Sequence, residues 1–130
     1  ILNYQKDSFN HLSFYNDIDI ALDTFPYNGV TTTFESVLMG VPVLTLKGFN
    51  FNSRCGESIN KNLKLENFIA ESYDDYYLKA LDLYKNIDYL KSLRKDLRNM
   101  AISSPLFDNK NFASIFSKKI KTIWENFIKG

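Results

Sequence analysis

The sequence predicts an α/β fold in which part of a parallel sheet is followed by C-terminal helices. In residues 1–70, short apolar runs alternate with segments of helical periodicity, a pattern typical of strand–helix–strand units with right-handed crossovers. In residues 71–130, the periodicity is helical throughout. We therefore expect residues 1–130 to form a single domain with an α/β portion, 1–70, and a helical portion, 71–130.

The α/β portion is expected to contain three strands and three helices. Continuous apolar runs favour buried strands, and these runs are residues 18–22, 41–46 and 68–70. The segments before and between the strands are each long enough for about two to three helical turns, and they are residues 7–16, 31–39 and 53–63.

The helical portion is expected to contain three helices with recognisable ends. Ser72 is a good N-cap for the first, Asp88 is expected to open the second, and Asp108 to cap the third. Pro105 is expected to end the second helix, because proline cannot continue a helix. The predicted apolar faces are Tyr76, Tyr77, Ala80, Leu81 and Tyr84; Leu90, Leu93, Leu97, Met100 and Ile102; and Phe112, Ile115, Phe116, Ile120, Ile123, Trp124 and Phe127.

Composition excludes several classes of protein. A net charge of +1 predicts no attraction to nucleic acid or to acidic membranes. No apolar run approaches the roughly 18 residues of a membrane-spanning helix. The single cysteine, Cys55, excludes an internal disulfide framework and fits a reducing compartment such as the cytoplasm. The chain begins without a methionine or a secretory signal, so we expect it to be cut from a longer polypeptide.

A loop rich in turn-forming and hydroxyl residues follows the first expected strand. Ligands of open parallel sheets bind beyond the carboxyl ends of the strands. Gly29 can adopt a positive φ, and three threonines, beginning with Thr31 and Thr32, then open a helix. This pattern indicates either a phosphate-binding loop or a threonine that caps an ordinary helix. Asp23, at the strand end, is expected to order the loop rather than act as a base.

His11 is the only histidine of the chain. The pattern around it allows a packing residue as well as a site residue. Without a second histidine, a His-based metal site is excluded, and Cys55 has no adjacent histidine for a Cys–His nucleophile. No Gly-x-Ser-x-Gly elbow is present either.

Residues 19–46, DIALDTFPYNGVTTTFESVLMGVPVLTL, resemble the C-terminal catalytic lobe of the O-linked N-acetylglucosamine transferase family. Bacterial relatives with tetratricopeptide repeats and the plant Spindly-type proteins share this stretch. The likeness continues through residues 53–54, 65–70 and 103–107, so it covers nearly the whole chain in one register. The resemblance implies a Rossmann-like sheet within the C-terminal lobe of a GT-B enzyme, whose two lobes face each other across a cleft.

The resemblance also implies a binding site for the UDP end of a sugar nucleotide. His11 corresponds to a family histidine at the uridine, and Phe14 is expected on the same wall. Thr31 and Thr32 correspond to paired threonines at the diphosphate, and Glu35 to an acid at the ribose.

Gly29 and Val30 complete this expected site, and four positions depart from the family pattern. One is Ser8, which stands where some relatives have a lysine near the phosphates. Val30 stands where many members have a histidine or a small residue, and Glu35 is one methylene longer than the commoner aspartate. Lys64 stands where relatives often have a helix-ending glycine, and a left-handed lysine there would cost about 1 kcal/mol.

The function implied by the resemblance is the UDP-sugar-binding lobe of a protein glycosyltransferase. Such an enzyme transfers N-acetylglucosamine from UDP-N-acetylglucosamine to Ser or Thr hydroxyls of an acceptor protein. It needs no metal or other cofactor, because the helix dipole, N–H groups and hydroxyls stabilise the departing UDP. The alternatives are a related transferase using UDP-glucose or an Asn acceptor, and a non-catalytic sugar-nucleotide-binding or scaffolding module.

The resemblance places the catalytic histidine and lysine, the other lobe and the repeats before Ile1. We therefore expect no catalytic residue in this fragment, and no activity from it alone. The expected partners are the UDP-sugar, the acceptor protein and the missing lobe. Exposed aromatic residues within 112–127 would mark the interface with that lobe.

Overall fold

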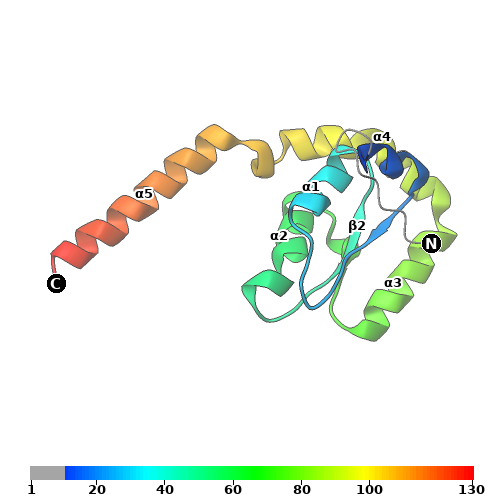
Figure 1. The fold of residues 1–130 in the computed structure, drawn as a ribbon, viewed down its shortest axis with the longest axis horizontal. Helices are drawn as coiled ribbons and strands as arrows, with labels where there is room; N and C mark the ends of the chain where they lie inside the picture. The colour runs from blue at the N-terminus through cyan, green and yellow to red at the C-terminus, as the bar shows by residue number, and fades with distance from the viewer. Residues whose placement is uncertain (1–10) are drawn as a thin grey trace.

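The computed structural model describes residues 11–130, and its body is built around a parallel sheet of three strands (Figure 1). The strands are β1 (Ala21–Leu22), β2 (Val43–Leu46) and β3 (Ile69–Ala70), in the order β1-β2-β3. Helix α1 (Thr31–Leu38) connects β1 to β2, and α2 (Cys55–Asn62) connects β2 to β3. The expected fragment of a Rossmann-like parallel sheet is therefore confirmed.

The register of the sheet brings the carboxyl ends of the strands to one edge. Ala21 pairs with Val43 across β1 and β2, and Thr45 pairs with Ile69 across β2 and β3. The loops that follow β1 and β2 therefore leave the sheet at the same edge, where open parallel sheets bind their ligands.

Several expected elements of this half are shorter than predicted, and in three of them the flanking residues form other hydrogen bonds or short 3₁₀ helices. Upstream of β1, the Ile18 carbonyl accepts a bond from Arg94 instead of joining the sheet. Residues 53–63 begin their helix only at Cys55, because Asn50 and Ser53 form a capping box around the short 3₁₀ helix η2 (Phe51–Ser53). Phe68 ends the 3₁₀ helix η3 (Glu66–Phe68) rather than opening β3.

The segment before β1 forms a 3₁₀ helix, η1 (His11–Asp17), in place of the helix expected over residues 7–16. Residues 7–10 of that expectation lie outside the described residues. Lys64 adopts the left-handed conformation expected for it, with a φ of 58°.

The helical portion follows the predicted ends closely. Helix α3 (Tyr73–Lys85) is capped by Ser72, whose Oγ accepts a bond from the Asp75 N–H at 3.1 Å. Helix α4 (Ile87–Ser103) begins one residue before the expected Asp88, and it ends before Pro105, which opens the 3₁₀ helix η4 (Pro105–Phe107). Helix α5 (Asn109–Ile128) is capped by Asp108, which accepts a bond from the Asn111 N–H at 3.0 Å.

The core lies where the sheet meets α1, α2, α3 and α4. Its fully buried members include Val37 of α1, Leu44 of β2, Phe68 of η3 and Leu97 of α4. Because burying one such side chain contributes about 1.5–3 kcal/mol, this cluster ties both portions of the chain into one body. The predicted stripe of α4 is confirmed for Leu90, Leu93 and Leu97, which are buried, whereas Ile102 is exposed.

The predicted apolar face of α3 is wrong in part. Tyr77, Leu81 and Tyr84 are exposed, whereas Leu83, which was not assigned to the face, is 4% exposed. Leu83 lies two helical turns after Tyr76, which also packs against the core.

Helix α5 projects from the body (Figure 1) and buries none of its residues. Its apolar residues are exposed, and they include Phe112, Ile115, Phe116, Ile120, Ile123, Trp124 and Phe127. Among residues 11–130, no helix is both long enough and apolar enough to cross a membrane.

Candidate functional site

The loop between β1 and α1 is organised by the carboxylate of Asp23, as expected. Oδ1 of Asp23 accepts bonds from the N–H groups of Thr24 at 3.0 Å and Gly29 at 2.8 Å. Oδ2 accepts a bond from the hydroxyl of Thr45 on β2 at 2.7 Å. The carboxylate is buried, so these bonds replace its hydration and fix the loop to the sheet.

Asn28 anchors the far end of the same loop. It is fully buried, and its Nδ2 donates to the Thr24 carbonyl at 3.0 Å. Its own N–H donates to the Asn52 carbonyl at 3.0 Å, which ties the loop to η2. The loop that leads into α1 is therefore held from β1, β2 and η2 together.

Tyr76 of α3 closes the other side of the loop. Its hydroxyl donates to the Asp23 carbonyl at 3.0 Å, and its ring meets Phe25 edge-on with centroids 5.6 Å apart. Burial, together with the charge of Asp23, raises the pKa of Tyr76 to about 12. The hydroxyl therefore stays protonated and remains a donor across the physiological range.

Gly29 serves the loop in a different way from the one predicted. Among residues 11–130, the glycines with positive φ are Gly40 and Gly130, so the expectation of a positive φ at Gly29 is wrong. A Cβ at Gly29 would lie 2.5 Å from Oγ1 of Thr32 and 3.0 Å from Oγ1 of Thr33. The position needs glycine because the threonine side chains approach its backbone so closely.

The start of α1 leaves its threonines open to a ligand. Val30 is the N-cap residue, and no side chain caps the helix, so the ordinary threonine cap is wrong. Thr33 bonds back to the Gly29 carbonyl at 3.0 Å. Within residues 11–130, the exposed hydroxyls of Thr31 and Thr32 take part in no hydrogen bond, and the first N–H groups of a helix have no partner within it.

A small cavity of about 180 Å³ opens beside this helix start. Gly29 and Thr32 line it with Asp23, Thr33 and Tyr15. It is smaller than the roughly 300–1,000 Å³ of sites that enclose a whole small molecule. It can therefore enclose only part of such a molecule.

The structure brings His11 and Glu35 together. Nε2 of His11 lies 3.5 Å from Oε2 of Glu35, across the contact between η1 and α1. Tyr15, also on η1, donates from its hydroxyl to the Thr32 carbonyl at 3.3 Å. Burial and the nearby Glu35 charge raise the pKa of Tyr15, so this donor also keeps its proton. His11, Glu35 and Thr32, expected at the uridine, the ribose and the diphosphate, thus lie together where η1 meets the start of α1, a place we call the junction.

Of the predicted site residues, Gly29 and Thr32 line the small cavity, whereas His11, Thr31 and Glu35 line neither that cavity nor a broader hollow of about 1080 Å³ beside it. Val30 does not line the small cavity but the broader hollow, which it shares with Phe34 of α1 and Phe51 of η2. Phe14 is half-buried on η1 and lines neither of these hollows.

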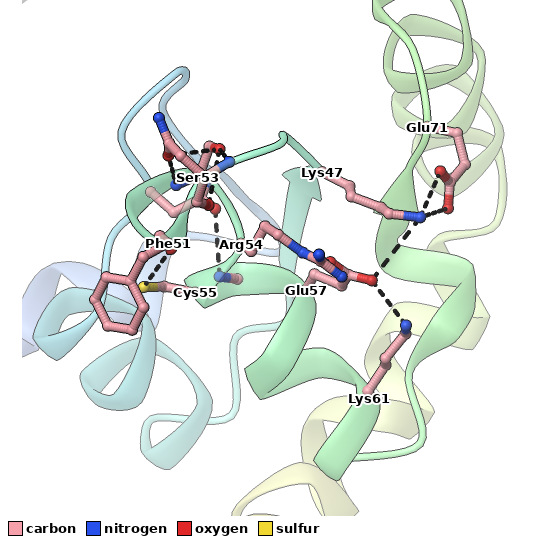
Figure 2. A network of polar contacts seen from close by, with 11 residues as sticks. Lys47, Phe51, Ser53, Arg54, Cys55, Glu57, Lys61 and Glu71 are labelled. Carbon is pink, nitrogen blue, oxygen red and sulfur yellow. Dashed lines mark hydrogen bonds and ion pairs between the residues drawn. The ribbon is translucent and has the colours of Figure 1, made fainter.

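A charged cluster lies beyond the end of β2 (Figure 2). Three of its members, Arg54, Glu57 and Lys61, line the broader hollow. Glu57 is 3% exposed, and its Oε1 lies 2.7 Å from Nζ of Lys61. Its Oε2 accepts a bond from Arg54 at 2.8 Å, and Lys47 lies 3.9 Å away while also binding Glu71 at 2.9 Å. Burial alone would raise the pKa of Glu57, but the bonds from Arg54 and Lys61 outweigh it and lower that pKa.

Glu57→Gln is expected to lower the free energy of unfolding by about 1–3 kcal/mol at pH 7, because two charge-assisted bonds are lost. The pKa of folded Glu57 lies below its ordinary value of 4.5, so its contribution is complete above that value. The contribution disappears as the pH falls through the lowered pKa. Urea unfolding of both proteins at pH 7 and pH 3 should therefore show a larger difference in stability at pH 7 than at pH 3. Glu66→Gln, at an exposed position of η3, is the control and should show no difference at either pH.

Sequence reasoning missed Tyr15 and Arg94. Tyr15 follows the predicted Phe14 in the sequence, so its aromatic side chain near His11 could have indicated a site residue. Arg94 lies far along the chain on α4, and its bonds to the Tyr15 and Ile18 carbonyls have no local signature.

Comparison with known proteins supports the resemblance seen in the sequence. Residues 9–116 match the model of glycosyl transferase family 41. The chain is 37% identical to a Hordeum vulgare protein over 121 residues, 93% of this chain and 13% of the relative. That protein is named "Probable UDP-N-acetylglucosamine--peptide N-acetylglucosaminyltransferase SPINDLY". An Arabidopsis thaliana protein whose name differs only in ending in SEC is 30% identical over 113 residues, 86% of this chain and 12% of the relative.

A solved structure gives the same answer. A mutant of the Thermobaculum terrenum O-GlcNAc transferase superposes with a TM-score of 0.83 at 33% identity. The match covers 92% of this chain and 23% of that one. The chain thus spans about 13% of the length of its SPINDLY relatives, and it is a fragment of a glycosyltransferase domain. The likeness extends over nearly all of its residues, and the chain belongs to glycosyl transferase family 41.

Proposed function

We propose that this chain is the UDP-sugar-binding lobe of a protein glycosyltransferase that transfers N-acetylglucosamine from UDP-N-acetylglucosamine to Ser or Thr hydroxyls. The observation that carries the proposal is the junction of η1 with the start of α1. There the His11–Glu35 pair, at 3.5 Å, adjoins a helix start with the exposed hydroxyls of Thr31 and Thr32. The names of the relatives support the donor and the acceptor.

In this proposal, the start of α1 holds the diphosphate. The hydroxyls of Thr31 and Thr32 and the first N–H groups of α1 donate hydrogen bonds to phosphate oxygens, and the helix dipole favours their charge. The N–H of Gly29 does not contribute, because it donates to Asp23. Glu35 lies one turn further along α1 and takes the ribose, while His11 and Phe14 of η1 contact the uridine.

The same donors stabilise the charge that develops on UDP as the bond to the sugar breaks. This role requires neither a metal nor another cofactor. The groups that activate the acceptor hydroxyl belong to the remainder of the polypeptide, so the fragment binds UDP without catalysing transfer. We place the whole protein in the cytoplasm, and we assign the exposed apolar face of α5 to the contact with the other lobe.

The experiment that tests the proposal is a titration of the ¹⁵N-labelled chain with UDP, followed by NMR. We expect weak binding, with shifts concentrated at His11, Thr31, Thr32 and Glu35. An absence of shifts at these residues in millimolar UDP would refute the site. Shifts of equal size throughout the chain would argue for non-specific binding.

The double substitution Thr31→Val and Thr32→Val is expected to lower the affinity for UDP by about tenfold or more. The reason is that hydrogen bonds to a charged group are worth about 1.5–3 kcal/mol. Uridine lacks phosphates, so its affinity should change by less than twofold. The measurement is the dissociation constant of each ligand from the NMR titration. Thr122→Val, on α5 far from the junction, is the matched control. Equal weakening of UDP and uridine would contradict the assignment of the hydroxyls to the diphosphate.

A further inference from the structure

Arg94 of α4 forms a two-pronged contact with the end of η1. Its Nη1 donates to the Ile18 carbonyl at 2.5 Å, and its Nη2 donates to the Tyr15 carbonyl at 2.6 Å. The planar guanidinium presents its donors in a fixed fork, so the two bonds restrain the orientation of η1 as well as its distance from α4. The cation also faces the carbonyl end of a helix, where positive charge is favoured.

Arg94 is itself placed by a rigid element. Leu90, Leu93 and Leu97 of the same helix are buried in the core. The end of α1 packs directly on the Arg94 backbone, because a Cβ at Gly40 would lie 2.9 Å from the Arg94 carbonyl oxygen. Helix α4 therefore fixes both α1 and the guanidinium that holds η1.

Side chains of η1 also contact α1. Tyr15 donates from its hydroxyl to the Thr32 carbonyl at 3.3 Å, and His11 lies 3.5 Å from Glu35. η1 buries none of its own residues, so the core does not fix its position. Its placement depends on contacts of this kind with α1 and α4.

We propose that Arg94 is a positioning residue for the nucleotide site, which sets the distance of the uridine wall on η1 from the diphosphate donors on α1. The proposal rests on the function proposed above. Arg94 lines neither hollow beside α1, and it acts through the backbone of Tyr15 and Ile18. Its loss should therefore affect the base end of the ligand and spare the phosphate end.

The test compares Arg94→Ala with Arg98→Ala, using UDP, uridine and inorganic pyrophosphate as probes in NMR titrations. Arg98 lies one turn further along α4 and also donates to a carbonyl, that of Leu38 at 2.8 Å, but among residues 11–130 it forms no hydrogen bond with η1. We expect Arg94→Ala to weaken the binding of UDP and of uridine by the same factor, about tenfold, because both ligands lose the fixed position of the uridine wall. Pyrophosphate affinity should change by less than twofold, and Arg98→Ala should change none of the three.

Arg94→Lys provides a second variant, because a single ammonium can replace only part of the fork. We expect an intermediate loss of uridine affinity, and faster amide hydrogen exchange confined to residues 11–18. Unchanged uridine affinity in Arg94→Ala would overturn the proposal. Equal weakening of pyrophosphate would also overturn it, because the role would then be general to the fold.

The two proposals fail in different ways. If the unmodified chain binds neither UDP nor uridine, the proposed function fails. The exchange measurement still decides whether Arg94 fixes η1, because it requires no ligand. Exchange that is unchanged in residues 11–18 of Arg94→Lys would refute the positioning role by itself.

Discussion

Asp23→Ala is expected to lower the free energy of unfolding by about 2–4 kcal/mol and to remove UDP binding. The substitution leaves the partly buried N–H of Gly29 and the fully buried hydroxyl of Thr45 without their acceptor, and a stranded buried donor costs about 1–3 kcal/mol. The N–H of Thr24 also loses its partner, but that residue is exposed and water can replace it. The start of α1 then loses its fixed connection to the sheet.

The matched control is Asp19→Ala, which removes an exposed carboxylate from the segment before β1. Asp23→Asn is expected to lose less than half as much stability, because its amide can donate to the Thr45 hydroxyl while its oxygen still accepts from Gly29. Urea unfolding monitored by far-UV circular dichroism measures all three. A loss in Asp23→Ala no larger than that in Asp19→Ala would contradict the organising role of Asp23.

Gly56→Ala is expected to destabilise the fold by about 3 kcal/mol, the upper part of the range for overpacked cores. A Cβ there would lie 2.2 Å from Oγ1 of Thr45 and 2.8 Å from Oδ2 of Asp23, where α2 packs against β2. The gain of about 1 kcal/mol that alanine normally brings to a helix offsets only part of this. Thermal and urea unfolding give the measurement.

Ser58→Ala, at an exposed position of the same helix, is the control and should change stability by less than about 0.5 kcal/mol. Adding Thr45→Ala to Gly56→Ala removes the closest clash. We therefore expect the double variant to be less destabilised than the sum of the two single variants. Additive effects would show that the two positions do not compete for the same space.

Helix ends could be predicted from the sequence because their signals are local. Ser72 and Asp108 each cap the helix that follows, and Pro105 ends the one before it. The apolar face of α3 could not be predicted in the same way. The helix carries aromatic and aliphatic residues around much of its circumference, and two overlapping stripes satisfy the helical period. Only its contacts with the sheet and α4 select Leu83 over Tyr84.

In the candidate site, too, the features with local sequence signals could be predicted and those that depend on distant residues could not. The position of Thr31 and Thr32 at a helix start followed from the sequence, because a strand, a turn and a helix succeed one another there. The role of Gly29 could not be predicted, because glycine is required both where φ is positive and where side chains approach the backbone closely. The sequence does not distinguish the two cases, and the structure shows the second. The fork of Arg94 joins residues more than 70 positions apart, so no local pattern could indicate it.

The isolation of α5 determines which spectroscopic signals report on the fold. Trp124 is the only tryptophan of the chain, and it is 60% exposed on that helix, with Phe127 as its ring neighbour at 6.0 Å. Intrinsic tryptophan fluorescence therefore follows the melting of α5 and is insensitive to the core. The same property makes Trp124 a built-in reporter of docking, since coverage of the α5 face would shift its emission to shorter wavelengths.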